Sequence, residues 1–278
     1  MYRSVQHQSV TLSPGRQYFF ASLFVAQLKA SVHKMAQRAS DPLLHSQPAY
    51  NNGTLPSSEP EDPSFRLASM VQTQRDKTGM ALVLAGTSLL GLSTITLILT
   101  SPVPKLFAWH PSLNSLSLVL VAIGISVVQP PTPPPDARQK RIDVHKHVLG
   151  FATLLLCGGV TSMYYNKEAN GAEHGASPHG AAGYVVLLWM IGQAVLGGIA
   201  LLAGKHGLWL YKWHRLSGYF FTASALFAAF VGGMLTPWSQ TRPAPLRIAA
   251  YCIGIPLIAT GLAMRVQTSK MSFGKRRA

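Results

Sequence analysis

The chain has 278 residues, of which only 12% are charged, whereas ordinary globular proteins have about 25%. Its mean hydropathy is positive, which together with the low charge disfavours a soluble fold. The net charge of +15 is typical of nucleic-acid-binding proteins. Here the basic residues stand in loops and tails between apolar runs, where they orient a membrane protein and contact anionic lipid. We therefore expect the lipid bilayer as a partner and no nucleic acid.

The N-terminal region differs from the rest of the chain. Residues 1–75 are rich in Ser, Gln and Pro and are predicted to form a disordered, cytoplasmic tail. Their apolar segment over residues 17–30 is shorter than the roughly 20 residues that a bilayer crossing needs. Residues 1–40 lack acidic residues and loosely resemble a transit or signal segment. The alternative hypothesis is that translation starts at Met35, which recovery of peptides from residues 1–34 of the native protein would reject.

From residue 78 onward, six apolar segments are each long enough to cross about 30 Å of hydrocarbon as a helix. We place them at residues 78–100, 111–129, 145–165, 179–203, 213–235 and 246–266. Breaks such as the proline-rich run at 130–135 separate them, because proline lacks the N–H donor that continues a helix. The sequence predicts an all-α membrane protein, with a six-transmembrane-helix bundle over residues 76–268 and a basic C-terminal tail over 269–278.

Lysine and arginine are unevenly shared between the two sides of this predicted bundle. The side with both termini holds 14 of them near the helix ends, and the other side holds 4. The four are Lys105, Lys167, Arg242 and Arg247. Because short cytoplasmic loops carry an excess of Lys and Arg, both termini are predicted to face the cytoplasm.

Four histidines recur at nearly constant intervals along the predicted bundle. His110, His145, His179 and His214 stand at or near the starts of the second to fifth helices, 35, 34 and 35 residues apart. Successive helices run in opposite directions, so His110 and His179 are expected on the non-cytoplasmic side and His145 and His214 on the cytoplasmic side. Each pair can supply two axial nitrogens to a haem iron.

The histidine pattern leaves alternatives open. A single histidine at a helix end is more often an interfacial group, although ionisable groups at membrane depth are costly and tend to be functional. Spacing alone does not choose between His145 and His147, and it does not exclude His174 or His206. Histidine pairs without nearby Cys or carboxylates are weak zinc or copper sites, and hydrolase and nucleotide-binding motifs are absent from the sequence.

Five short motifs, in this order, resemble the cytochrome b561 family and especially its small domain-containing members. They are FAWHP at 107–111, KRIDVH at 140–145, Asn-Lys-Glu at 166–168, SPHGAAG at 177–183 and LYKWHRLSGY at 210–219. The resemblance covers residues 78–268 and implies two haem b cofactors. It implies that His110 and His179 bind the non-cytoplasmic haem iron, that His145 and His214 bind the cytoplasmic one, and that His145 is the ligand rather than His147.

The resemblance also implies transmembrane electron transfer, from cytoplasmic ascorbate to monodehydroascorbate or a ferric chelate on the opposite side. An anionic donor favours a basic vestibule beside the cytoplasmic haem. The candidates for it are Lys140, Arg141, Lys146, Lys212 and Arg215, and those for holding an anion on the far side are Lys105 and Lys167. The chain departs from larger family members at Gly180, where they have an aromatic residue, and at Ile142, where some have Lys.

Two other classes of protein stay open at this point. One is a non-enzymatic haem-binding membrane subunit, and the other is a proton-coupled transporter, although the apolar segments contain almost no acidic residues. For a reductase of the cytochrome b561 type, we further expect an endomembrane location, vacuolar or vesicular rather than at the plasma membrane, and a homodimer.

Overall fold

The computed structural model describes residues 73–129, 135–203 and 207–267. The predictions for residues 1–72, for a start at Met35 and for the C-terminal tail fall outside these described residues. The described residues all belong to one compact unit. Within its described part, the chain forms helices and contains no strand.

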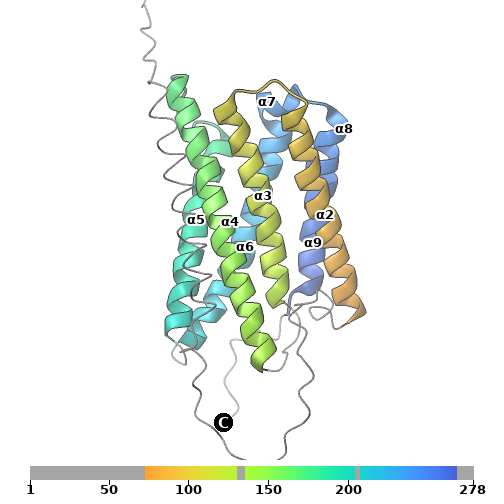
Figure 1. Ribbon diagram of the computed structural model, residues 1–278, viewed down its shortest axis with the longest axis vertical. Coiled ribbons are helices and arrows are strands. Elements are labelled where there is room, and N and C mark those ends of the chain that lie inside the picture. The colour runs from red at the N-terminus through yellow and green to blue at the C-terminus, as the bar shows by residue number, and fades with distance from the viewer. Residues whose placement is uncertain (1–72, 130–134, 204–206, 268–278) are drawn as a thin grey trace, which may run out of the picture. The chain divides into compact units, whose positions relative to one another are not determined.

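The helices cross the unit side by side (Figure 1). They are α2 (Gln74–Leu99), α3 (Lys105–Val128), α4 (Pro135–Ala169), α5 (Pro178–Leu202), α6 (Leu208–Leu235), α7 (Pro237–Gln240), α8 (Ala244–Arg247), the π-helical segment η4 (Ile248–Gly254) and α9 (Ile255–Arg265). Six spans in the described residues are long and apolar enough to cross a membrane, the sixth running from α8 through α9. This confirms the predicted all-α, six-helix fold of an integral membrane protein.

Three helices begin at least five residues earlier than the sequence predicts. α3 begins at Lys105 rather than at residue 111, α4 at Pro135 rather than 145, and α6 at Leu208 rather than 213. Hydropathy detects only the apolar part of a helix, whereas the polar turns before it satisfy their own backbone hydrogen bonds in the interfacial region. His110, His145 and His214 therefore lie inside their helices, at least one turn after the first residue, whereas His179 is the second residue of α5.

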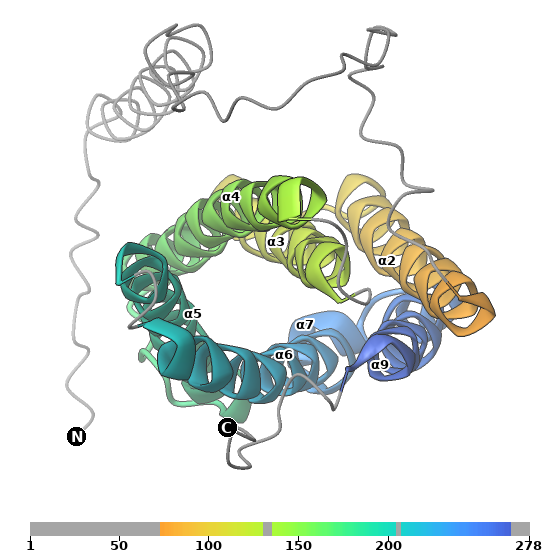
Figure 2. The same ribbon diagram turned by 90° about the horizontal axis from the view of Figure 1, so that it is seen from below.

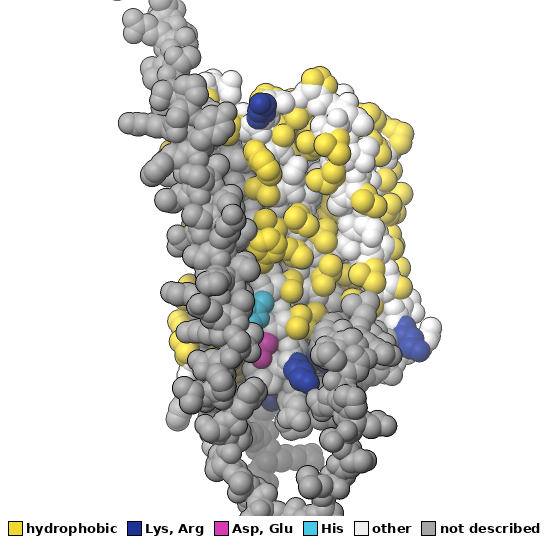
Figure 3. All heavy atoms as spheres, in the orientation of Figure 1, with side chains coloured by type: hydrophobic (Ala, Val, Ile, Leu, Met, Phe, Trp, Pro, Cys, Tyr) yellow, Lys and Arg dark blue, Asp and Glu magenta, His cyan; other side chains and the backbone are white. Residues whose placement is uncertain are grey.

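The helices pack mainly as neighbouring pairs. α3 packs against α4, α5 against α6, and α2 against α9 and η4. Viewed along the helices, α2 and α9 lie together at one edge of the set formed by α3 to α6 (Figure 2). The face in Figure 3 carries apolar side chains over its middle, with Lys and Arg towards its two ends, as expected where a protein faces lipid between two aqueous layers.

Glycines bring α2 close to the last span, which comprises η4 and α9. A Cβ on Gly86 would lie 2.6 Å from the carbonyl oxygen of Gly254, and a Cβ on Gly79 would lie 2.9 Å from that of Gly261. In lipid, helices associate largely through van der Waals packing, and small residues let their backbones approach. The two glycine contacts, one with Gly254 at the end of η4 and one with Gly261 on α9, thus fix how α2 packs against the last span.

We expect Gly86→Ala to destabilise this pair by about 1–3 kcal/mol, the usual cost of inserting a methyl group into close packing. Gly91→Ala on the same helix is the matched control, because its Cβ would lie 3.6 Å from Cγ2 of Val119, an ordinary contact. Thermal melting of the detergent-solubilised variants measures the difference. Equal melting temperatures would contradict the assigned packing.

Arg265 joins three helices at the end of the bundle where the described chain starts and ends. Its side chain is fully buried and donates hydrogen bonds to the carbonyl oxygens of Asp76 on α2, at 2.7 Å, and Ser126 on α3, at 3.0 Å. In the sequence Arg265 counts only as one of the basic residues that orient the protein. In the structure it is an internal link between α9, α2 and α3.

Candidate functional site

The four regularly spaced histidines come together as two pairs inside the bundle. His110 on α3 faces His179 on α5, with ring centroids 5.8 Å apart, and His145 on α4 faces His214 on α6, with centroids 6.2 Å apart. We call His110 and His179 the outer pair and His145 and His214 the inner pair. The structure thus brings together the residues that helix parity pairs, at two levels of the same four helices.

Backbone carbonyls orient three of the four rings. Nδ1 of His110 lies 3.0 Å from the carbonyl oxygen of Gly159, and Nδ1 of His179 lies 3.0 Å from that of Ala228. A carbonyl oxygen can only accept, so these hydrogen bonds require the proton on Nδ1 and leave Nε2 with its lone pair. Nδ1 of His110 also lies 3.2 Å from Nδ2 of Asn114. A donor hydrogen bond of this kind fixes the tautomer and orientation of metal-binding histidines.

The inner pair repeats this arrangement in part. Nδ1 of His145 donates to the carbonyl oxygen of Gly124, at 2.9 Å. The backbone of Gln193 lies beside the His214 ring, although Nδ1 of His214 makes no well-formed hydrogen bond there. Gln193 precedes His214 by 21 residues, the same interval by which Gly124 precedes His145. The α3–α4 and α5–α6 hairpins therefore present matching half-sites.

Two glycines on α5 and α6 allow the rings to lie against a neighbouring backbone. A Cβ on Gly232 would lie 2.5 Å from Cε1 of His179, and a Cβ on Gly197 would lie 3.0 Å from Cε1 of His214. Contacts below 3.0 Å essentially never occur for a real Cβ. Any larger residue at position 232 would therefore displace the His179 ring.

The donor set of each pair fits a haem rather than a bare metal ion. Among the described residues, there is no group of three or more His, Cys, Asp or Glu side chains that could hold a metal, and tetrahedral zinc needs further ligands. Two metal–nitrogen bonds of about 2 Å each, together with the distance of about 1 Å from each bonded nitrogen to the centroid of its ring, give roughly 6 Å between the two centroids. The observed 5.8 and 6.2 Å match this span, and a porphyrin supplies the other four nitrogens of the iron.

Comparison with known proteins agrees with this chemistry. Residues 109–239, which contain all four histidines, match the family model of eukaryotic cytochrome b561. This part of the chain is similar to the cytochrome b561 family, the family that the five sequence motifs resemble. Proteins of this family bind haem b.

Similarity to curated relatives covers 119 residues. The transmembrane reductase CYB561D2 is 31% identical in Bos taurus, 30% in Homo sapiens and 29% in Mus musculus. The aligned part is 42% of this chain and 53% of each relative. The chain therefore spans about half the length of the curated relatives it matches.

Of the three further histidines that the sequence left open, two lie outside both pairs. His147 is exposed, and its Nδ1 lies 2.8 Å from the carbonyl oxygen of Asp143 in the same helix. His174 lies in the loop between α4 and α5, where its Nε2 is 2.7 Å from Oε1 of Glu168. The structure does not describe His206.

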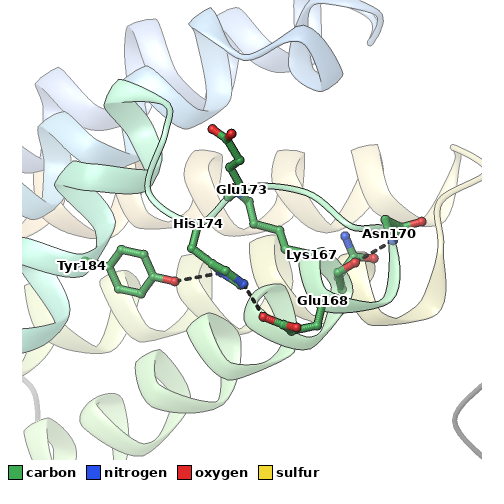
Figure 4. Close-up of polar contacts among 7 residues, drawn as sticks. Lys167, Glu168, Asn170, Glu173, His174 and Tyr184 are labelled. Carbon is green, nitrogen blue, oxygen red and sulfur yellow. Dashed lines mark hydrogen bonds and ion pairs between the residues drawn. The ribbon is translucent and has the colours of Figure 1, made fainter. Parts of the chain in front are cut away.

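The α4–α5 loop folds around His174 (Figure 4). Tyr184 approaches Nδ1 of His174 at 3.4 Å, on the opposite side of the ring from Glu168, and Tyr164 stacks on the ring with centroids 4.3 Å apart. Lys167 donates from Nζ to the carbonyl oxygen of Glu173 at 2.6 Å. The loop therefore holds the Lys167 ammonium in a defined place.

Of the two cations considered for the far side, Lys167 is the better placed. It interacts electrostatically with both His110 and His179. Lys105 is exposed at the first turn of α3, and no contact ties it to the outer pair. The sequence alone does not distinguish the two lysines, because the conformation of the α4–α5 loop cannot be predicted from its composition.

The five basic residues considered for the inner side differ in their surroundings. Arg141 is only 5% exposed and lies one helical turn before His145, on the same side of α4. Arg215 is half-buried and acts electrostatically on the neighbouring His214. Lys146 is exposed and forms an ion pair with Asp143 at 3.0 Å. The remaining two are Lys140, which is exposed, and Lys212, which is half-buried.

Proposed function

We propose that this protein binds two haem b groups, one at each histidine pair, and transfers electrons across the bilayer between them. The observation that carries the proposal is the presence of two facing imidazole pairs at opposite levels of the same four apolar helices. The curated relatives, which are named transmembrane reductases, support a redox function. When bound, haem supplies one-electron Fe(III)/Fe(II) chemistry.

The residues of the chain have the remaining roles. His110 and His179 would hold one iron, and His145 and His214 the other. The carbonyls of Gly159, Ala228 and Gly124 orient three of these rings, and hydrogen bonding to Nδ1–H makes Nε2 a stronger ligand. The apolar helices exclude water from the path between the two levels.

For the electron donor we propose ascorbate on the cytoplasmic side, next to the inner pair. The excess of basic residues at the end with both described termini supports this orientation. Arg215, beside His214, and Arg141, one turn from His145, provide positive potential that favours an anion. For the far side we propose monodehydroascorbate or a ferric chelate as acceptor, with Lys167 favouring anionic forms of either.

A spectrum of the purified protein tests this function. Ascorbate is expected to reduce the protein, with the b-type absorbance bands appearing in the reduced-minus-oxidised difference spectrum. Dithionite gives the fully reduced reference. A protein that contains haem but is not reduced by ascorbate would instead be a haem-binding subunit, and a protein without haem bands would contradict the proposal.

Replacing one basic residue tests the donor site. We expect Arg215→Gln to raise the KM for ascorbate at least about tenfold, because a hydrogen bond or ion pair to a charged group is worth about 1.5–3 kcal/mol. Lys146, which is also a candidate from the sequence, is exposed and paired with Asp143. Lys146→Gln is therefore the control and is expected to change KM less than about twofold, because exposed ion pairs contribute little. Stopped-flow reduction at varied ascorbate concentrations gives both values, and equal KM values in the two variants would remove Arg215 from the donor site.

A further inference from the structure

The two histidine levels are equally spaced on all four helices. Each of the four helices carries a paired histidine at one level and, 14 residues further along, a residue at the other level. The backbone of that second residue lies beside a histidine of a neighbouring helix. These residue pairs are 110 and 124 on α3, 145 and 159 on α4, 179 and 193 on α5, and 214 and 228 on α6. Fourteen residues of α-helix extend about 21 Å, so a layer of protein lies between the levels.

The residues halfway between the levels form a single buried layer. Each is seven residues from a paired histidine, and seven residues are close to two helical turns, so each faces the same way as that histidine. They are Ser117 at 2% exposure, Ala152 at 0%, Val186 at 6% and Phe221 at 3%. Burial at all four positions agrees with this register, and we call them the middle layer.

The middle layer contains little that can bind water or a proton. Three of its residues are apolar, and the hydroxyl of Ser117 donates to the carbonyl oxygen of Ala152 at 2.8 Å, which links α3 to α4. The side chains on α3 and α4 are small, so most of the side-chain volume of the layer comes from α5 and α6. Phe221 is the largest of the four and the one aromatic residue among them.

We propose that Phe221 is a positioning residue for electron transfer between the two levels, which rests on the proposed function. Its ring fills the middle layer with closely packed atoms and keeps water out. The rate of electron tunnelling falls steeply across empty space. A smaller side chain at position 221 would leave a void, and the atom contacts that now connect the two levels there would be lost. As an electron passes, one level is oxidised and the other reduced, and no bond or proton in the middle layer changes.

A neighbouring phenylalanine provides the matched control. Phe220 is 61% exposed on the lipid side of the same helix, so Phe220→Leu makes the same chemical change outside the layer. The test variants are Phe221→Leu and Phe221→Met, of which the second preserves more volume if the first does not assemble. Stopped-flow absorbance follows reduction of the inner level by ascorbate and then of the outer level.

In the Phe221 variants the second, outer phase is expected to slow about threefold or more, because packed contacts between the levels are lost. The first phase and the behaviour of Phe220→Leu are expected to match the wild type. Haem content and the electron paramagnetic resonance signals of both sites are the readouts independent of turnover, and unchanged signals show that both histidine pairs are intact.

An outer phase in Phe221→Leu and Phe221→Met equal to that of Phe220→Leu would overturn the role of Phe221. Changed resonance signals that account for the slower phase would also overturn it, because the effect would then come from displaced histidines. Failure of the proposed function looks different, since the wild-type protein itself would then lack haem or ascorbate reduction.

Discussion

Replacing either histidine of a pair is expected to remove the same haem. His110→Ala and His179→Ala should each lose the outer haem, and His145→Ala and His214→Ala the inner haem, because an iron between two imidazoles loses one of its axial ligands. Each variant is expected to keep close to half of the wild-type haem content. Reduced-minus-oxidised spectra and pyridine haemochrome assays of the purified variants measure which half is lost.

His147→Ala is the control for this series. His147 is two residues from His145, but its side chain is exposed and its Nδ1 contacts the carbonyl oxygen of Asp143 in the same helix. Full haem content is therefore expected in this variant. The pairing would be contradicted if His110→Ala and His145→Ala left the same residual spectrum. It would also be contradicted if any single change removed both haems from a folded protein.

The second large effect is expected from the glycine beside the outer pair. In Gly232→Ala the new methyl group would lie 2.5 Å from Cε1 of His179, so the ring must move away from its hydrogen bond to Ala228. Overpacking of about 1–3 kcal/mol corresponds to a loss of outer-haem affinity of roughly 5- to 150-fold. Haem titration into the haem-depleted variant measures this affinity.

Gly218→Ala, on the same helix, is the control for that measurement. Its Cβ would lie 3.5 Å from Oε1 of Gln193, an ordinary contact, so wild-type haem binding is expected. At the inner pair, Gly197→Ala should have a smaller effect than Gly232→Ala because its contact with His214 is 3.0 Å. Outer-haem affinity in Gly232→Ala equal to that in Gly218→Ala would mean that the ring tolerates a side chain there.

The fold was largely predictable because crossing a bilayer makes strong and simple demands on a sequence. Length and apolar content suffice to find six spans. They do not find polar helical turns, such as those before His145, and they do not find the π-helical segment at Ile248–Gly254 inside the sixth span. Pro256 follows that segment and cannot donate a backbone hydrogen bond to the preceding turn, and such a missing donor is a common cause of irregular helix.

The histidine pairs were predictable for a different reason. Helix parity decides which side of the bilayer a residue occupies, so regular spacing was enough to propose which histidines meet. The register between helices cannot be read from one sequence, and therefore the carbonyls that orient the rings and the role of Gly232 were not foreseen. For the same reason the sequence alone places Arg265 among the charges that orient the protein, although it is buried between three helices.

The number of haems per chain tests the central claim most directly. The protein, expressed with ample haem supply and purified in detergent, is assayed for haem b by pyridine haemochrome and for protein by amino-acid analysis. Two imidazole pairs predict two haem b groups per chain. A ratio of one would leave one pair without its proposed role, and a ratio of zero would contradict the account as a whole.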